Sequence, residues 1–160
     1  MAGDRERGTT VPATGVRFPE ALAFDAAGNL YIGTDDSVLK LDSSGQTIVV
    51  AGGYNPDPPY GDGGPAVDAG LFRPEALAFD AVGNLFIADW GHLRVRKVDA
   101  SGIITTVAGG GPTANVGDGG PATSANLQPT GLAFDARGNL YISDVINNRI
   151  RMVQNLPTSK

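Results

Sequence analysis

Two glutamates of this 160-residue chain lie in matching sequence contexts and could act together. Glu20 and Glu75 each follow a proline directly and precede a leucine by two residues, and Thr130 stands at the third such position. Carboxylate oxygens are the ligands that hard cations such as calcium prefer. The sequence therefore offers a site for calcium or another divalent cation at Glu20 and Glu75. The alternative is that both are solvated carboxylates and that no cofactor is bound.

Aromatic and polar side chains form a second candidate group, suited to ligand binding. Trp90 stands two residues before His92, the single histidine of the chain, and Tyr54 and Tyr60 enclose a segment with three prolines. Such side chains are typical of protein, peptide or sugar contacts. We predict ligand contacts at Trp90, His92, Tyr54 and Tyr60, and at Asn147, the counterpart of His92 in a later repeat. Alternatively, Trp90 packs over the adjacent loop and the tyrosines cap a neighbouring element.

Charged residues recur in two further patterns. Four arginines alternate with apolar residues, so that Arg94 shares a strand face with Arg96, and Arg149 with Arg151. They form either an anion-binding patch or ion pairs with Asp89, Asp144 and carboxylates of neighbouring units, and the acidic balance of the chain favours pairing. The segment Gly-Asp-Gly-Gly-Pro-Ala occurs twice. Its aspartates, Asp62 and Asp118, are expected to cap the short helices that follow, with calcium binding as the alternative.

Composition excludes several classes of function. A formal charge of −5 and an isoelectric point near 4.6 argue against nucleic acid as a partner, because phosphate binding needs clustered lysine and arginine. The chain has no cysteine, which excludes a thiol nucleophile, a disulfide and a cysteine-ligated zinc. No apolar window is long enough to span a membrane, so no membrane partner is expected. The sequence shows no Ser-His-Asp order and no phosphate loop, and we expect no enzyme activity.

The elements that must position these residues are repeats. Phe-Asp-Ala-x-Gly-Asn-Leu begins at Phe24, Phe79 and Phe134, with a spacing of 55 residues. In each copy an aspartate opens a tight turn, and a glycine three residues later supplies the left-handed conformation that the turn needs. The predicted structural turn residues are therefore Asp25, Asp80 and Asp135 with Gly28, Gly83 and Gly138.

Each repeat is predicted to be a four-stranded antiparallel meander. In the middle copy we expect strand a at 75–80, b at 84–89, c at 93–99 and d at 103–108, because short alternating apolar runs end at Asp, Ser or Gly. A long segment with one helical turn after Pro121 then leads to the next repeat. A repeated meander with a long crossover is the unit of a β-propeller, so the predicted fold class is all-β.

The residues at 84–89, 139–144 and 147–151 closely resemble the bacterial NHL repeat, and the resemblance covers nearly residues 9–153. It implies a six-bladed ring. Metal-dependent lactonase-like propellers have a glutamate at a point similar to Glu20 and Glu75, near the channel mouth. A single histidine cannot form the multi-histidine zinc site of an amidating-lyase propeller, which counts against catalysis.

The repeats divide the chain into blades. We expect a polar tail at 1–8, an outer strand at 9–15, blade 1 at 16–70, blade 2 at 71–127, blade 3 without its own outer strand at 128–153, and a tail at 154–160. Thr9-Thr10-Val11 matches Thr105-Thr106-Val107 of strand d. Because a ring needs about four to eight blades, we predict a homodimer in which this strand completes the third blade of the partner. A truncated propeller is the alternative.

The sequence thus predicts a non-enzymatic scaffold that assembles into a closed ring and binds a protein or peptide on the face of the b–c turns and long loops. One alternative is a hydrolase or lyase with a metal at the channel mouth. Another is a propeller fragment, or an engineered self-assembling chain, without a ligand. The polar first eight residues do not resemble a signal peptide. The compartment stays open, with an extracytoplasmic location in a bacterium favoured.

Overall fold

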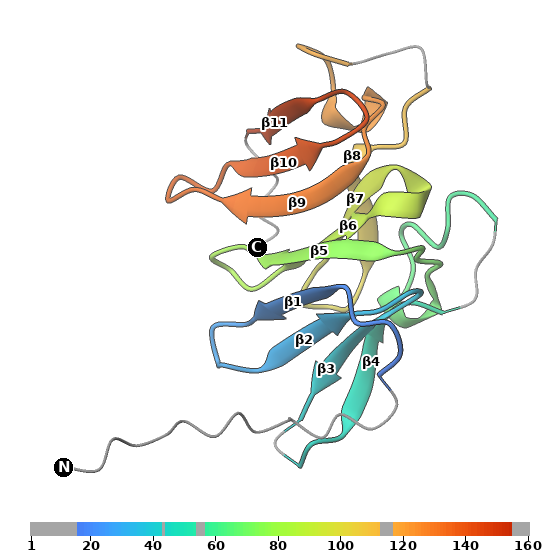
Figure 1. Cartoon of the computed structure of the whole chain (residues 1–160), viewed down its shortest axis with the longest axis vertical. Coiled ribbons are helices and arrows are strands. Elements are labelled where there is room, and N and C mark those ends of the chain that lie inside the picture. Colours follow the sequence, from blue (N-terminus) through green and yellow to red (C-terminus); the bar gives the residue numbers. More distant parts are fainter. Residues whose placement is uncertain (1–15, 43, 54–56, 113–116, 155–160) are drawn as a thin grey trace.

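The computed structural model describes residues 16–42, 44–53, 57–112 and 117–154. They form three antiparallel sheets arranged side by side, with β1, β5 and β9 as neighbours (Figure 1). Blade 1 contains β1 (Ala21–Phe24), β2 (Leu30–Gly33), β3 (Val38–Leu41) and β4 (Thr47–Ala51). Blade 2 contains β5 (Pro74–Phe79), β6 (Leu85–Asp89), β7 (Arg94–Val98) and β8 (Ile104–Gly109). Blade 3 contains β9 (Pro129–Phe134), β10 (Leu140–Asp144) and β11 (Arg149–Val153).

The predicted fold class is confirmed. The four strands of blade 2 begin and end within one residue of the predicted bounds, and each pairs with the next in an antiparallel meander. Blade 1 has the same strand order, and the described residues of blade 3 supply its first three strands. These sheets are β-propeller blades. The predicted outer strand at 9–15 lies outside the described residues, as does nearly all of the tail at 154–160.

The a–b turn has the same hydrogen bonds in all three blades. In blade 2, Oδ1 of Asp80 accepts the backbone N–H groups of Val82 at 3.1 Å and Asn84 at 2.8 Å, and Oδ2 accepts the Asn84 amide at 2.7 Å. The corresponding amide bonds from Asn29 and Asn139, more than any other contact, hold the pKa of Asp25 and Asp135 below the usual value. The turn is therefore fixed by one carboxylate that gathers three donors.

The glycine of this turn is expected to tolerate asparagine better than alanine. Gly83 has a φ of +90°, and a Cβ added there would meet nothing within 4 Å, so only the backbone conformation opposes a side chain. We expect Gly83→Ala to lower the free energy of unfolding by about 1–2 kcal/mol and Gly83→Asn by less, because asparagine tolerates left-handed conformations. Urea unfolding of the two variants measures the difference. Equal losses would contradict this explanation.

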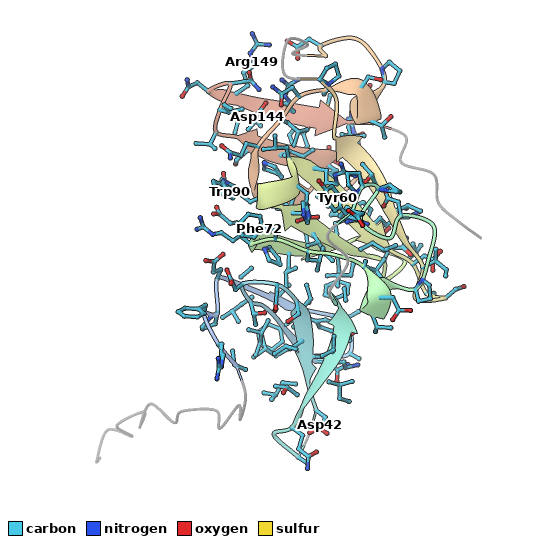
Figure 2. The ribbon with its side chains drawn as sticks, turned by 90° about the vertical axis from the view of Figure 1, so that its right-hand side faces the viewer. Asp42, Tyr60, Phe72, Trp90, Asp144 and Arg149 are labelled. Carbon is cyan, nitrogen blue, oxygen red and sulfur yellow. The ribbon has the colours of Figure 1, made fainter. Side chains whose placement is uncertain are left out.

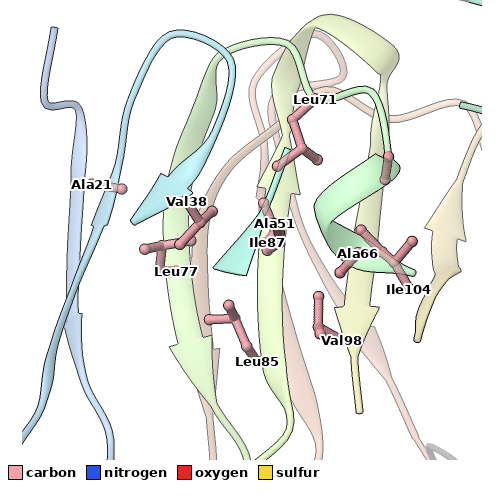
Figure 3. Packing of buried hydrophobic residues seen from close by; sticks show 11 residues of the cluster. Ala21, Val38, Ala51, Ala66, Leu71, Leu77, Leu85, Ile87, Val98 and Ile104 are labelled. Carbon is pink, nitrogen blue, oxygen red and sulfur yellow. The ribbon is translucent and has the colours of Figure 1, made fainter. Parts of the chain in front are cut away.

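The cores lie between the blades. One cluster joins blades 1 and 2 through Val38, Leu77, Ile87 and their neighbours (Figure 3), and a second joins blades 2 and 3. Each blade therefore buries its apolar face against the next one, as repeat architectures require.

Both interfaces contain the same aromatic pair. A strand-a phenylalanine meets the second residue of strand b in the preceding blade edge-to-face, and the ring centroids of Phe79 and Tyr31 lie 4.8 Å apart. Phe134 and Phe86 repeat this geometry at 4.8 Å. We call this pair the flank contact.

The two outer flanks carry the unused halves of the flank contact. Phe24 of β1 matches Phe79 and Phe134 in sequence, yet 67% of its surface is exposed because no described blade precedes it. At the other end, Tyr141 of β10 matches Tyr31 and Phe86, and 36% of its surface is exposed. Leu22, Ile150 and Met152 are exposed beside them. The described residues thus end in a phenylalanine on one side and a receiving ring on the other.

The long loops differ from their sequence prediction in one respect. Short 3-10 helices do follow Pro65 and Pro121, at η1 (Ala66–Asp68) and η3 (Ala122–Ser124). However, no side chain caps either helix, so the expected capping by Asp62 and Asp118 is wrong. Both aspartates instead bind arginines of the following blade, which offer stronger charge-assisted hydrogen bonds. Among the described helices, none is long and apolar enough to cross a membrane.

Candidate functional site

The b–c turn of blade 2 is built on a buried carboxylate. Asp89 ends β6 and is fully buried. One of its oxygens accepts the backbone N–H of Phe72 at 2.9 Å, and the other accepts the Arg96 guanidinium at 3.3 Å. Nδ1 of His92, in η2 (Trp90–His92), lies 3.0 Å from the same carboxylate. Asp89 therefore fixes the position of the histidine ring.

Two of the predicted ligand-binding residues meet at this turn. The rings of His92 and Tyr60 stack with centroids 3.8 Å apart and planes 19° apart, although they come from different blades. The Arg94 guanidinium lies 5.0 Å from the centre of the Tyr60 ring. Figure 2 labels Tyr60 and Trp90 between Asp42 of blade 1 and Asp144 of blade 3. Tyr54, predicted for the same loop, lies outside the described residues.

Arg73 brings together three more of the predicted residues, Trp90 and Glu75 of blade 2 and Glu20 of blade 1. The sequence patterns did not identify Arg73 itself. Its guanidinium lies 4.6 Å from the Trp90 ring centre. It also lies 3.5 Å from a carboxylate oxygen of Glu20 and 3.1 Å from one of Glu75. Trp90, Glu20 and Glu75 are thus brought together by one cation of the chain itself.

The metal prediction at Glu20 and Glu75 stays a prediction. A bound cation would have to share these carboxylates with Arg73, which lies within salt-bridge distance of both. Within the described residues, no group of three or more His, Cys, Asp or Glu side chains could hold a metal ion. The two carboxylates could supply oxygen ligands only if the guanidinium moved aside.

Blade 3 repeats the turn with an amide in place of the imidazole. The Asn147 side-chain amide donates to Asp144 at 2.8 Å and to the backbone oxygen of Asn126 at 3.0 Å. Asp144 also accepts the Gln128 N–H at 3.0 Å, as Asp89 accepts that of Phe72. Asn147 therefore corresponds to His92, since each contacts the carboxylate that ends strand b of its own blade, but His92 also stacks on Tyr60.

The arginines are paired. Arg96 is fully buried and lies 2.8 Å from Asp62 as well as 3.3 Å from Asp89. In blade 3, Arg151 lies 2.8 Å from Asp118 and 2.6 Å from Asp144. The outer arginines, Arg94 and Arg149, contact the same loop aspartates. In each case one carboxylate ends strand b and the other comes from the preceding long loop, which favours a structural role for the arginines.

Comparison with known proteins identifies the fold. A family model described as "Strictosidine synthase-like, N-terminal" matches residues 7–36. Human Teneurin-4 is 32% identical over 164 residues, which cover 87% of this chain but 6% of Teneurin-4. The three 55-residue repeats fold as antiparallel meanders, and these matches are consistent with NHL-type repeats. The chain is built of NHL-type β-propeller blades.

Solved structures agree on the fold of the NHL-type chain. An auxiliary nutrient binding protein from Bacteroides ovatus superposes with a TM-score of 0.65 at 22% identity, over 82% of this chain and 36% of its own. Virginiamycin B lyase from Staphylococcus aureus superposes with a TM-score of 0.54 at 12% identity, over 89% and 42%. The chain thus spans less than half of these structures and a small part of Teneurin-4. At these identities the structures show the fold alone.

Acid should weaken the third NHL-type blade through Asp144. Burial by itself raises the pKa of this carboxyl, but hydrogen bonds from Arg151, the Gln128 N–H and Asn147 outweigh it, and the net pKa is lowered. Stability from Asp144 is therefore present above the unfolded pKa of about 4 and is lost as the pH falls through the folded value. We expect Asp144→Asn to lower the free energy of unfolding at pH 7 by about 1–3 kcal/mol and to cost less at pH 3.

Urea unfolding of wild type and Asp144→Asn at the two pH values measures this difference. Asp68→Asn is the matched control, because Asp68 is exposed on η1 and should change stability by less than about 0.5 kcal/mol at either pH. A deficit of Asp144→Asn that stayed constant from pH 7 to pH 3 would contradict the assignment.

Proposed function

We propose that this chain is a non-enzymatic NHL-type scaffold of which two copies close into a six-bladed ring. The open halves of the flank contact carry the proposal. Phe24 of one copy would meet Tyr141 of the other in the geometry that joins Phe79 to Tyr31 within the chain. Because both outer flanks follow the pattern of the internal interfaces, the same contact used twice joins two arcs of three blades. Burial of these aromatic side chains would stabilise the six-bladed assembly.

The face of the ring that carries the b–c turns and long loops would bind a protein or peptide ligand. This face supports the proposal because it collects the differences between blades: His92 stacked on Tyr60, and Trp90 on Arg73. The opposite face carries the nearly identical a–b turns. Aromatic side chains that pack on ion-paired residues lose little conformational entropy on binding, which suits a recognition surface.

The solution mass tests the ring. Light scattering of the full chain should give twice the 16.4 kDa of one chain. A mass of one chain in a folded sample would reject the proposed assembly.

A phage-displayed library of random peptides tests the binding face. Peptides enriched on the wild type should lose binding to Tyr60→Ala and keep it to Val82→Ala, an exposed residue of an a–b turn on the opposite face. Enrichment that is insensitive to Tyr60→Ala would place the ligand elsewhere.

A further inference from the structure

The outer edge of blade 3 differs from the outer edges of the other blades. Among the described residues, β11 pairs with β10 alone, whereas β7 of blade 2 pairs with β6 on one side and β8 on the other. Figure 1 shows β11 at the outer end of the fan. Blade 2 therefore shows what a strand would meet at this edge.

In blade 2 the outer strand β8 is held by a hydroxyl and by the preceding loop. The Thr106 hydroxyl donates to Oδ2 of Asp62 at 2.5 Å and accepts from Arg94 at 3.3 Å. The backbone of Ile104 donates to Gly64 at 3.0 Å and accepts from Gly63 at 2.8 Å. The strand thus lies between β7 and the Gly-Asp-Gly-Gly loop of blade 1.

Among the described residues, blade 3 has counterparts of these loop and c-strand groups but no outer strand. Asp118 stands at the position of Asp62, and it binds Arg149 and Arg151 as Asp62 binds Arg94 and Arg96. Gly119 and Gly120 stand at the positions of Gly63 and Gly64. A cavity of about 460 Å³ lies between this loop and β11, and its lining also includes Leu127, Ile142 and Val153. The cavity occupies the place that β8 fills in blade 2.

The outer-strand residue at this position matches the polarity of the strand-c residue that it faces. In blade 2, Arg96 is opposite Thr106, and in blade 1 the equivalent pair is Leu39 opposite Val49. Polar therefore faces polar and apolar faces apolar. By the same rule, Arg151 of blade 3 should face a polar residue such as threonine.

We infer that the edge of β11, together with Asp118 and Arg149, is a strand-binding site that recognises a threonine hydroxyl, and that its occupant is residues 8–11 of a second copy. The pair Thr-Thr occurs twice in the chain, at 9–10 and at 105–106, and a valine follows each time. The register of blade 2 then sets Thr10 opposite Arg151, with its hydroxyl on Asp118, and Thr9 opposite Met152.

A second copy, and not the same chain, supplies the strand. Residue 16 leads into blade 1, at the opposite end of the fan from β11 (Figure 1). Thr10 lies six residues before this point, and an extended chain of six residues spans at most about 22 Å. In the ring proposed above, on which this inference rests, the blade 1 of the partner lies next to blade 3.

Cysteine cross-linking tests the site directly, because the chain has no cysteine of its own. Opposed residues of antiparallel strands lie about 4.5–5.5 Å apart, within the range of a disulfide. We expect the full chain carrying Thr9→Cys and Met152→Cys to form, under mild oxidation, a product with the mass of two chains on a non-reducing gel. The matched control is Thr9→Cys with Ile150→Cys, since a shift of two residues moves the pair beyond disulfide reach.

The outcomes separate this inference from the proposed ring. Cross-linking within one chain would reject the second copy as the occupant. The third outcome is a mass of two chains by light scattering together with a Thr9–Met152 pair that cross-links no faster than the Thr9–Ile150 control. It would reject the strand site but not the proposed ring.

Removing the hydroxyl tests the role of Asp118. Thr10→Val should lower the binding constant of the strand at each site about tenfold. The dimer dissociation constant should then rise about 100-fold if both sites are filled. Thr10→Ser, which keeps the hydroxyl, should change it by less than about threefold. Equal dissociation constants for Thr10→Val and Thr10→Ser would overturn the hydroxyl recognition.

Discussion

Replacing Arg96 by leucine should lower the free energy of unfolding by about 3–5 kcal/mol. The substitution leaves Asp89 fully buried without the guanidinium that neutralises it. It also removes hydrogen bonds to the backbone oxygens of Gly70 and Tyr60, at 3.3 Å and 3.2 Å. Since the whole fold is expected to be stable by about 5–15 kcal/mol, urea unfolding should show a large shift of the midpoint.

Blade 1 provides the control for this substitution. It has Thr34 and Leu39 where blade 2 has Asp89 and Arg96, and Thr34 makes local bonds to Ser37 instead of an ion pair. The double variant Asp89→Thr with Arg96→Leu copies this arrangement and should recover at least half of the lost stability. If the double variant were no more stable than Arg96→Leu alone, an unpaired Asp89 would not be the cause of the loss.

Replacing Phe24 by aspartate should separate the two copies of the proposed ring. The carboxylate would be buried against Tyr141 without a cation, which costs several kcal/mol at each of two interfaces. We expect the dimer dissociation constant to rise by at least about 1,000-fold, so that light scattering gives the mass of one chain at concentrations where the wild type gives two.

Val82→Asp is the matched control for Phe24→Asp. Val82 is similarly exposed in the described chain, at 62% against 67%, but lies on an a–b turn and not on a flank. Its substitution should leave the two-chain mass unchanged. A Phe24→Asp chain that kept the mass of two chains would show that this flank does not join the copies.

The repeats made the fold predictable from the sequence. Their period fixes the meander, and the Asp-to-Gly spacing marks turns whose hydrogen bonds all fall within five residues, as at Asp80. Local signals of this kind survive in any context that keeps the turn exposed. The strands of blade 2 were therefore placed within one residue, and the propeller architecture was confirmed.

The candidate site was less predictable because its contacts are long-range. Asp62 precedes a proline and a short helix and looks locally like a cap, yet it binds Arg96, 34 residues away. The gathering of Glu20 and Glu75 on Arg73 was not predicted either. Arg73 has no counterpart in the other repeats, where Phe18 and Gln128 stand at its position. A residue that breaks a repeat was the available signal.

The loop that crosses from each blade to the next has a consequence for biosynthesis. Asp62 leaves blade 1 to pair with Arg96 of blade 2, and Asp118 leaves blade 2 to pair with Arg151 of blade 3. Arg96 and Arg151 therefore emerge from the ribosome after the loop aspartates that pair with them. Chains fold from the N-terminus as they are made. Blades 2 and 3 can therefore each form their ion pair with a loop aspartate of the preceding blade that has already been synthesised.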